Sequence, residues 1–207
     1  MRKLFTLCFV LRSGEILLGL KKRGFGAGRW NGFGGKLNPG ESIEEAAVRE
    51  TEEESGIIVR DLIRAGTHEF EFSNDPGTIL EVHVFCCWDY SGKIIETEEM
   101  KPCWFRFQDI PYTEMWPDDI HWLPLLLQGK KFKTRFLFGA GDTLLEWSVE
   151  EKDDVIRKTI ECDADFLRAD TCSHTFFRGV PWMAGASSWK CRRPGKGPAC
   201  LSGRFPE

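Results

Sequence analysis

The segment 35–57, in which a glycine-containing loop leads into a glutamate-rich helix, constrains the fold of this chain more than any other feature. Ser42 is a candidate N-cap, and Glu45 three residues later completes a capping-box pattern. Gly56 favours a left-handed stop at the other end. The pattern therefore predicts a helix over 42–54 whose two ends are both fixed.

This helix concentrates negative charge where a helix tolerates it least. Glu50, Glu53 and Glu54 fall at i, i+3 and i+4, so their side chains share one face. They lie near the C-terminal end, where the helix dipole disfavours anions. A hard divalent cation, Mg²⁺ or Mn²⁺, would relieve the repulsion, because carboxylate oxygens are its preferred ligands. Runs of glutamate are more often solvated helix faces, so the cluster by itself leaves both interpretations open.

The residues around the cluster favour the metal interpretation, because their spacing resembles the signature of the Nudix hydrolases, G-x5-E-x7-R-E-U-x-E-E-x-G-U, with U a bulky aliphatic residue. The only departure is Thr51, which puts a hydroxyl on the packed face and so bears on stability rather than on chemistry. The matching residues are Gly35, Glu41, Arg49, Glu50, Glu53, Glu54, Gly56 and Ile57.

The resemblance implies a chemistry, the hydrolysis of a diphosphate linkage with Mg²⁺ as cofactor and Mn²⁺ as an alternative. It makes Glu50, Glu53 and Glu54 the catalytic residues, with Glu53 either a metal ligand or the general base. The metal ligands that it implies are these three glutamates, the carbonyl of Gly35, and Glu99 from a separate acidic stretch.

The sequence on either side of this segment bears on the substrate. Residues 21–36, 82–85, 102–105 and 115–119 resemble the MutT branch of the family in its mammalian form, which hydrolyses oxidised purine nucleoside triphosphates to the monophosphate and pyrophosphate. The substrate-binding residues implied by the resemblance are Thr6, Lys21, Asn31, Phe33, Gly34, Gly35, Lys36, Trp116, Pro117, Asp118 and Asp119.

Several of these residues suit a purine pocket on physical grounds. Trp116 offers a flat face for stacking, worth about 1–3 kcal/mol per base, and Asn31 carries both a donor and an acceptor. If Asp118 and Asp119 both face a desolvated pocket, they cannot both be ionised, and one then acts as a donor. Such a pair would accept both 8-oxoguanine and 2-hydroxyadenine. The Trp-Pro-Asp-Asp run is also typical of a helix N-terminus, and the two interpretations are compatible.

The remaining patterns within 1–153 predict an α+β fold. The resemblance implies the α/β/α form of the Nudix hydrolases, a mixed curved β-sheet flanked by helices, with the loop-helix-loop motif at 35–57. Phe70, Phe72 and Phe138 are assigned to the core. The expected strands are 5–11, 16–20, 66–72, 80–88, 103–107, 132–138 and 143–149, and a second helix is expected over 117–128.

After Asp153 the periodicity fades, so we expect a Nudix hydrolase domain over 1–153 and a poorly ordered C-terminal extension over 154–207. Two alternatives to the implied function stay open. One is a Nudix hydrolase of another nucleoside diphosphate-linked or methylated purine substrate. The other is a nucleotide-binding protein that its C-terminal extension has inactivated.

Composition limits the partners of the chain. A net charge of −4 gives no global positive field, so we expect small-molecule substrates and no stable nucleic-acid binding. No apolar run approaches the ~20 residues that span a membrane. The eight cysteines lack paired spacing, which is typical of reduced thiols inside the cell. We expect a monomer in the cytoplasm, with nuclear and mitochondrial pools left open.

Overall fold

The computed structural model describes residues 1–156, so nearly all of the extension expected over 154–207 lies outside the described residues. In chain order the elements are β1 (Arg2–Arg12), β2 (Glu15–Lys21), β3 (Trp30–Asn31), α1 (Ile43–Ser55), β4 (Ile57–Arg60), β5 (Ile63–Phe72), β6 (Ile79–Cys87), β7 (Asp89–Gly92), β8 (Met100–Arg106), η1 (Phe107–Asp109), η2 (Tyr112–Glu114), α2 (Asp119–Leu127), β9 (Lys130–Phe138), η3 (Ala140–Asp142) and β10 (Leu144–Val155).

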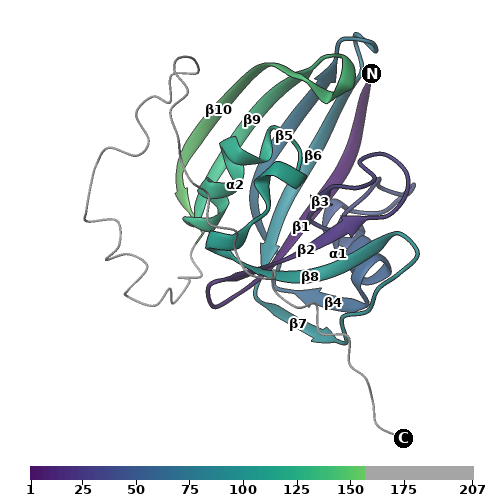
Figure 1. The fold of residues 1–207 in the computed structure, drawn as a ribbon, viewed down its shortest axis with the longest axis vertical. Helices are drawn as coiled ribbons and strands as arrows, with labels where there is room; N and C mark the ends of the chain where they lie inside the picture. The colour runs from purple at the N-terminus through teal and green to yellow at the C-terminus, as the bar shows by residue number, and fades with distance from the viewer. Residues whose placement is uncertain (157–207) are drawn as a thin grey trace, which may run out of the picture. The chain divides into compact units, whose positions relative to one another are not determined.

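Most of these strands form one mixed sheet in the order β10-β9-β5-β6-β1-β2-β3, with β8 paired to β2 (Figure 1). β1 pairs with β6 and β5 with β9 in parallel, whereas the other pairs of this sheet are antiparallel. β4 and β7 form a separate two-stranded sheet. The predicted α+β class, a mixed sheet with flanking helices, is confirmed.

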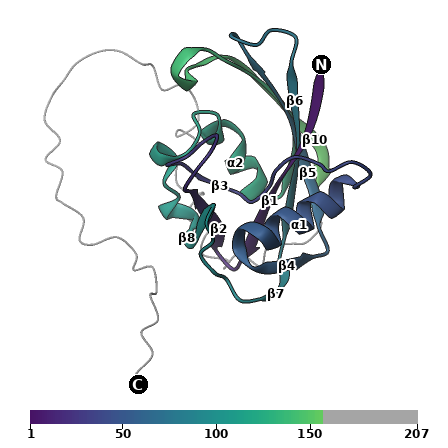
Figure 2. The same ribbon diagram turned by 90° about the vertical axis from the view of Figure 1, so that its right-hand side faces the viewer.

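The sheet separates two hydrophobic cores, because successive side chains of a strand point to opposite faces. In β1, Phe9 and Leu11 belong to the core that includes α2, whereas Cys8 and Val10 belong to the core that includes α1. Figure 2 shows the two helices on opposite sides of these strands. The same sheet can therefore support a cavity on one face and the glutamate helix on the other.

The glutamate helix forms as its end signals predict. The Ser42 side chain accepts a hydrogen bond from the Glu45 N–H at 3.2 Å, and the Glu45 carboxylate accepts one from the Ser42 N–H at 2.9 Å. Gly56 ends the helix with a φ of 78°. Thr51 is fully buried, and its hydroxyl donates to the Ala47 carbonyl oxygen at 2.7 Å. The hydroxyl at this position is thus satisfied inside the helix.

Other boundaries differ from the expectation. β3, β4 and β7 have only two to four residues each, too few for a periodic pattern. The second helix begins at Asp119 rather than at 117, because the Asp119 N–H closes a turn onto the Trp116 carbonyl oxygen at 3.1 Å. β10 continues to Val155, past the proposed boundary at 153, which stays a prediction. Within residues 1–156 no helix is long and apolar enough to cross a membrane.

Candidate active site

A cavity of about 500 Å³ opens between the sheet, the glycine-rich loop before α1, and the segment that begins α2. Its wall combines apolar side chains of β1, β5, β6 and β9 with polar groups from the loop and from α2. The structure brings most of the predicted substrate residues to this wall. They are Thr6, Lys21, Asn31, Gly34, Gly35, Trp116, Asp118 and Asp119, and Glu99 joins them.

Three predicted substrate residues are not among the described residues that line the cavity. The Phe33 ring is fully buried in the core beside α1, so it contributes to packing and not to the cavity. Lys36 is exposed, and its carbonyl oxygen accepts from Arg49 at 3.3 Å. Pro117 is half-buried between two lining residues.

The core assignment of Phe70, Phe72 and Phe138 is confirmed, and all three also line the cavity, which the sequence did not predict. Phe25 of the glycine-rich loop also lines it, and its ring stacks on Trp116 with centroids 5.0 Å apart. The alternation His-Glu-Phe-Glu-Phe over 68–72 was a usable signal of one apolar face. It does not reveal that α2 leaves part of this face uncovered.

The two adjacent aspartates are buried together in the wall. Asp118 accepts from the Trp122 indole N–H at 3.1 Å, and Asp119 accepts from the Trp116 backbone N–H at 3.0 Å. Burial raises the pKa of Asp118 to about 6. Burial, and then the charge of its neighbour, raise the pKa of Asp119 well above its ordinary value. The pair therefore retains a proton near neutral pH, so one carboxyl can donate while the other accepts.

Because Asp118 is buried, the free energy of unfolding should depend on pH. A carboxyl whose pKa is raised on folding, here from 3.8 to about 6 for Asp118, stabilises the fold below 3.8 and loses that contribution as the pH rises through 6. Between pH 4.5 and 7.5 the wild type should therefore lose unfolding free energy, on the order of 2 kcal/mol, relative to Asp118→Asn, which also removes the charge that raises the pKa of Asp119. Urea unfolding of both proteins at the two pH values measures this difference.

A second buried group makes the comparison with the variant necessary. Burial lowers the pKa of His68 to about 3, so its contribution has the opposite sign and is lost as the pH falls below 6.5. Both proteins keep His68, and its effect cancels in the difference. A difference that does not change with pH would contradict the burial of the Asp118 carboxyl.

Glu54 connects the helix to the cavity. It is only 4% exposed, and its two oxygens accept from Lys21 Nζ at 2.8 Å and from the Gly34 N–H at 2.9 Å. Burial raises the pKa of Glu54, and these two donors only partly oppose it. Because Lys21 and Gly34 line the cavity, the carboxylate lies directly behind its polar end.

Arg49 holds the other carboxylates of the segment. Its guanidinium donates to both oxygens of Glu41, at 2.7 and 2.9 Å, and to Glu50 at 2.8 Å and Glu53 at 3.1 Å. The hydrogen bonds from Arg49 lower the pKa of Glu41 to about 2. At Gly35 an added Cβ would lie 2.5 Å from the Glu50 carboxyl carbon, so this carboxylate approaches the backbone only because a glycine is there.

The last two predicted ligands lie near this cluster but have other partners. Glu99 accepts from Arg23 at 2.7 Å and from Lys21 at 3.3 Å, and the Gly35 carbonyl oxygen accepts from the Thr6 N–H at 2.9 Å. Among residues 1–156, no three His, Cys, Asp or Glu side chains are grouped closely enough to hold a metal ion. Arg49, Arg23 and Lys21 donate to the carboxylates of this cluster and offset part of its negative charge.

Comparison with known proteins identifies the family of this chain. Mouse oxidized purine nucleoside triphosphate hydrolase is 50% identical over 151 residues, which are 73% of this chain and 96% of that protein. The zebrafish protein of the same name is 48% identical over 153 residues, 74% of this chain and 97% of that protein. The MutT protein of Bacillus halodurans shares the fold, with a TM-score of 0.65 and 24% identity over 72% of this chain and 97% of its own. The NUDIX domain model matches residues 1–126, and the chain is a member of the Nudix hydrolase family.

Proposed function

We propose that this protein hydrolyses oxidised purine (deoxy)nucleoside triphosphates, such as 8-oxo-dGTP and 2-hydroxy-dATP, to the monophosphate and pyrophosphate. One observation carries the proposal: the aromatic cavity that contains the buried aspartate pair is joined to the glutamate helix by Lys21, which lines the cavity and bonds Glu54 at 2.8 Å. A base at one end would place its phosphates toward the other. The names of the mouse and zebrafish relatives agree with this substrate class.

At the base end, Trp116 supplies an aromatic face and Asn31 an amide whose oxygen already accepts from the Gly32 N–H at 2.8 Å. Because that bond occupies the amide oxygen, the amide nitrogen on the other side of the group is left to act as a donor. Asp118 and Asp119 share a proton, so they present one donor and one acceptor whose order can be exchanged. An oxidised purine differs from its parent base in the positions of its hydrogen-bond donors and acceptors. The amide of Asn31 and the aspartate pair would distinguish the two bases by this difference.

At the phosphate end, Nudix hydrolases use a divalent metal ion, and we assign Mg²⁺ to Glu50, Glu54 and the Gly35 carbonyl, with Glu99 in support. The donors match a hard cation in their chemistry, because all are oxygens and the helix carboxylates share one face, although no three acidic side chains of residues 1–156 are grouped around one point. When bound, the ion polarises the phosphate oxygens and lowers the pKa of the attacking water. Glu53 is 59% exposed, so its carboxylate reaches solvent and is assigned as the base. Lys21 neutralises the buried Glu54 and orients it.

We further propose that the enzyme works as a monomer on small nucleotides in the cytoplasm, without binding nucleic acid. The negative net charge of −4 supports the absence of nucleic-acid binding. Size-exclusion chromatography with light scattering and imaging of the tagged chain would test the oligomeric state and the compartment.

The full chain should be assayed against 8-oxo-dGTP, 2-hydroxy-dATP, dGTP, ADP-ribose and a methylated purine triphosphate, with Mg²⁺ and with chelator. We expect kcat/KM for the oxidised purines to exceed that for dGTP by at least about 10-fold, since a hydrogen-bonding pocket penalises unpaired polar groups. Chelation should abolish turnover. A preference for ADP-ribose or the methylated purine would overturn the substrate assignment, and tight binding without turnover would overturn the assignment as an enzyme.

A further inference from the structure

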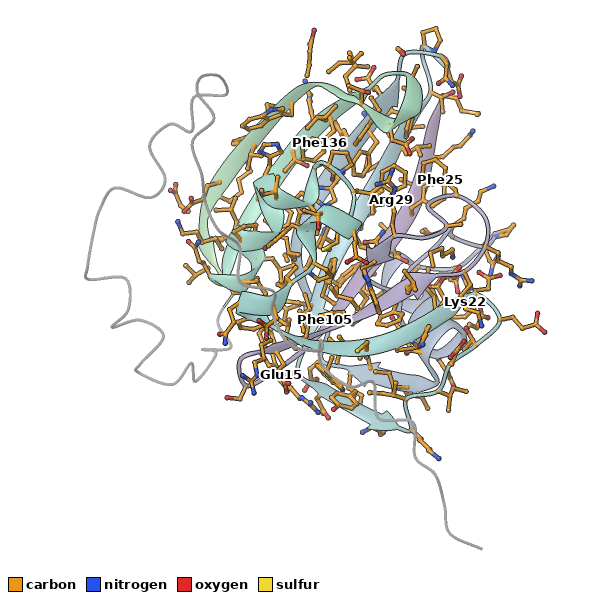
Figure 3. The ribbon with its side chains drawn as sticks, in the orientation of Figure 1. Glu15, Lys22, Phe25, Arg29, Phe105 and Phe136 are labelled. Atoms are coloured by element: carbon orange, nitrogen blue, oxygen red, sulfur yellow. The ribbon has the colours of Figure 1, made fainter. Side chains whose placement is uncertain are left out.

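Arg29 connects three parts of the chain that are far apart in sequence. Its Nη1 donates to the Met115 carbonyl oxygen at 3.0 Å, immediately before Trp116, and its Nη2 donates to Asp142 of η3 at 2.9 Å. Its guanidinium carbon also lies 4.6 Å from the centroid of the Trp116 indole. Arg29 therefore ties the glycine-rich loop to the chain on both sides of α2, and it lies between that loop and α2 (Figure 3).

The guanidinium is rigidly placed against the indole. Arginine is planar, so it can lie flat on an aromatic ring while its nitrogens donate at the edge, whereas a lysine ammonium cannot do both. The bond to the Met115 carbonyl oxygen fixes the guanidinium relative to the backbone next to Trp116, and the bond to the Asp142 carboxylate ties it to η3. The tilt of the indole is therefore set by Arg29 as well as by the backbone torsions of Trp116.

Phe25 contacts the same indole in a different way. Its ring stacks on Trp116 at an interplanar angle of 28°, but it is 70% exposed and has ring contacts only. It lies between Gly24 and Gly26, which both have positive φ. Because glycine has no Cβ, these two residues restrict the backbone of the loop less than others would. The buried Phe138 also meets the indole, edge to face with centroids 6.0 Å apart. Of Arg29 and Phe25, Arg29 is the one fixed by hydrogen bonds, and Phe25 is the one that can give way to a ligand.

Trp116 lines the cavity, whereas Arg29 is not among the described residues that line it. We propose that Arg29 is a positioning residue: by contacting the Trp116 indole and bonding the backbone beside it, it sets the affinity for the purine base without touching the substrate. The inference rests on the proposed function for the identity of the ligand. Asp142 accepts from the second guanidinium nitrogen and so has the same positioning role.

The kinetic test compares Arg29→Met, Arg29→Lys and Asp142→Asn in the full chain. We expect Arg29→Met to raise KM for 8-oxo-dGTP by about 5–10-fold, the size of one cation–π contact with its hydrogen bonds, with kcat changed less than about twofold. Asp142→Asn should give a smaller rise, because asparagine keeps the shape and tolerates the φ of 57° at this position. Arg29→Lys should restore only part of the affinity.

Arg12 provides the matched control. It also lies over a tryptophan, 4.0 Å from the centroid of the Trp104 ring, and pairs with Glu15 at 2.6 Å, but neither aromatic nor cation lines the cavity. Arg12→Met should therefore leave KM unchanged. An equal rise of KM in the Arg12 and Arg29 variants, or a full rescue by Arg29→Lys, would overturn the positioning role.

A second readout does not depend on turnover. Amide hydrogen exchange of the free protein should speed up over residues 24–31 and 112–119 in Arg29→Met and stay unchanged there in Arg12→Met. If the wild type does not hydrolyse oxidised purines, the proposed function fails, while exchange still decides the role of Arg29. Unchanged exchange in both segments would overturn the inference whatever the substrate is.

Discussion

Glu54→Gln is expected to lower kcat for 8-oxo-dGTP by roughly 10²–10⁴-fold, the range for losing a metal or acid-base group. The carboxylate is 4% exposed and is bonded by Lys21 and by the Gly34 N–H. Glutamine has the same shape but no charge, and its amide would set a donor against one of these two donors. Steady-state kinetics at saturating Mg²⁺ measure the loss.

Glu52→Gln is the control for this variant, because Glu52 lies on the same helix with its side chain exposed. It should retain near-normal turnover. Thermal unfolding of both variants separates a loss of catalysis from a loss of fold. If Glu54→Gln and Glu53→Gln both kept near-normal turnover, the assignment of chemistry to this helix would be wrong.

Asp119→Asn should change which oxidised purine is preferred, shifting the ratio of kcat/KM between 8-oxo-dGTP and 2-hydroxy-dATP by about 10²-fold. Burial raises the pKa of both carboxyls, so the pair retains a proton near neutral pH and one member can donate while the other accepts. Asparagine fixes the donor at one position, since its oxygen is needed by the Trp116 N–H. The wall then suits only one of the two bases.

The matched measurement is the Mg²⁺ concentration that gives half-maximal activity, which should not change in Asp119→Asn because the pair lies at the base end of the cavity. An unchanged ratio of the two substrates would remove the aspartate pair from base recognition. A changed Mg²⁺ requirement would instead point to a distortion that reaches the glutamate helix.

The glutamate helix was predictable because its determinants are local. Its cap, its stop and its carboxylate face all lie within 42–56, where helical spacing alone fixes the geometry. Thr51 looked like a departure from the family pattern, and only the structure shows its hydroxyl bonded to the backbone one turn earlier.

The cavity was only partly predictable because its wall depends on what covers the sheet. Phe70 and Phe138 have the pattern of core residues, and they are core residues, yet α2 covers the sheet incompletely and leaves them facing the cavity as well. Phe33 shows the reverse case, since its neighbours line the wall while its own ring packs beside α1. Arg29 and Asp142 are 113 residues apart, and no spacing rule connects them.

The two faces of β5 and β6 differ sharply in chemistry. Phe70, Leu80 and Val82 face the apolar cavity, whereas Glu69 and Glu81 line a charged groove with several lysines and arginines. The pocket therefore survives a deletion within either strand only if an even number of residues is lost. Losing one residue would turn carboxylates toward the base, whereas losing two would preserve the apolar wall. Length changes in a lineage of such enzymes should accumulate in the turn over 73–78, where an odd number of residues does no such harm.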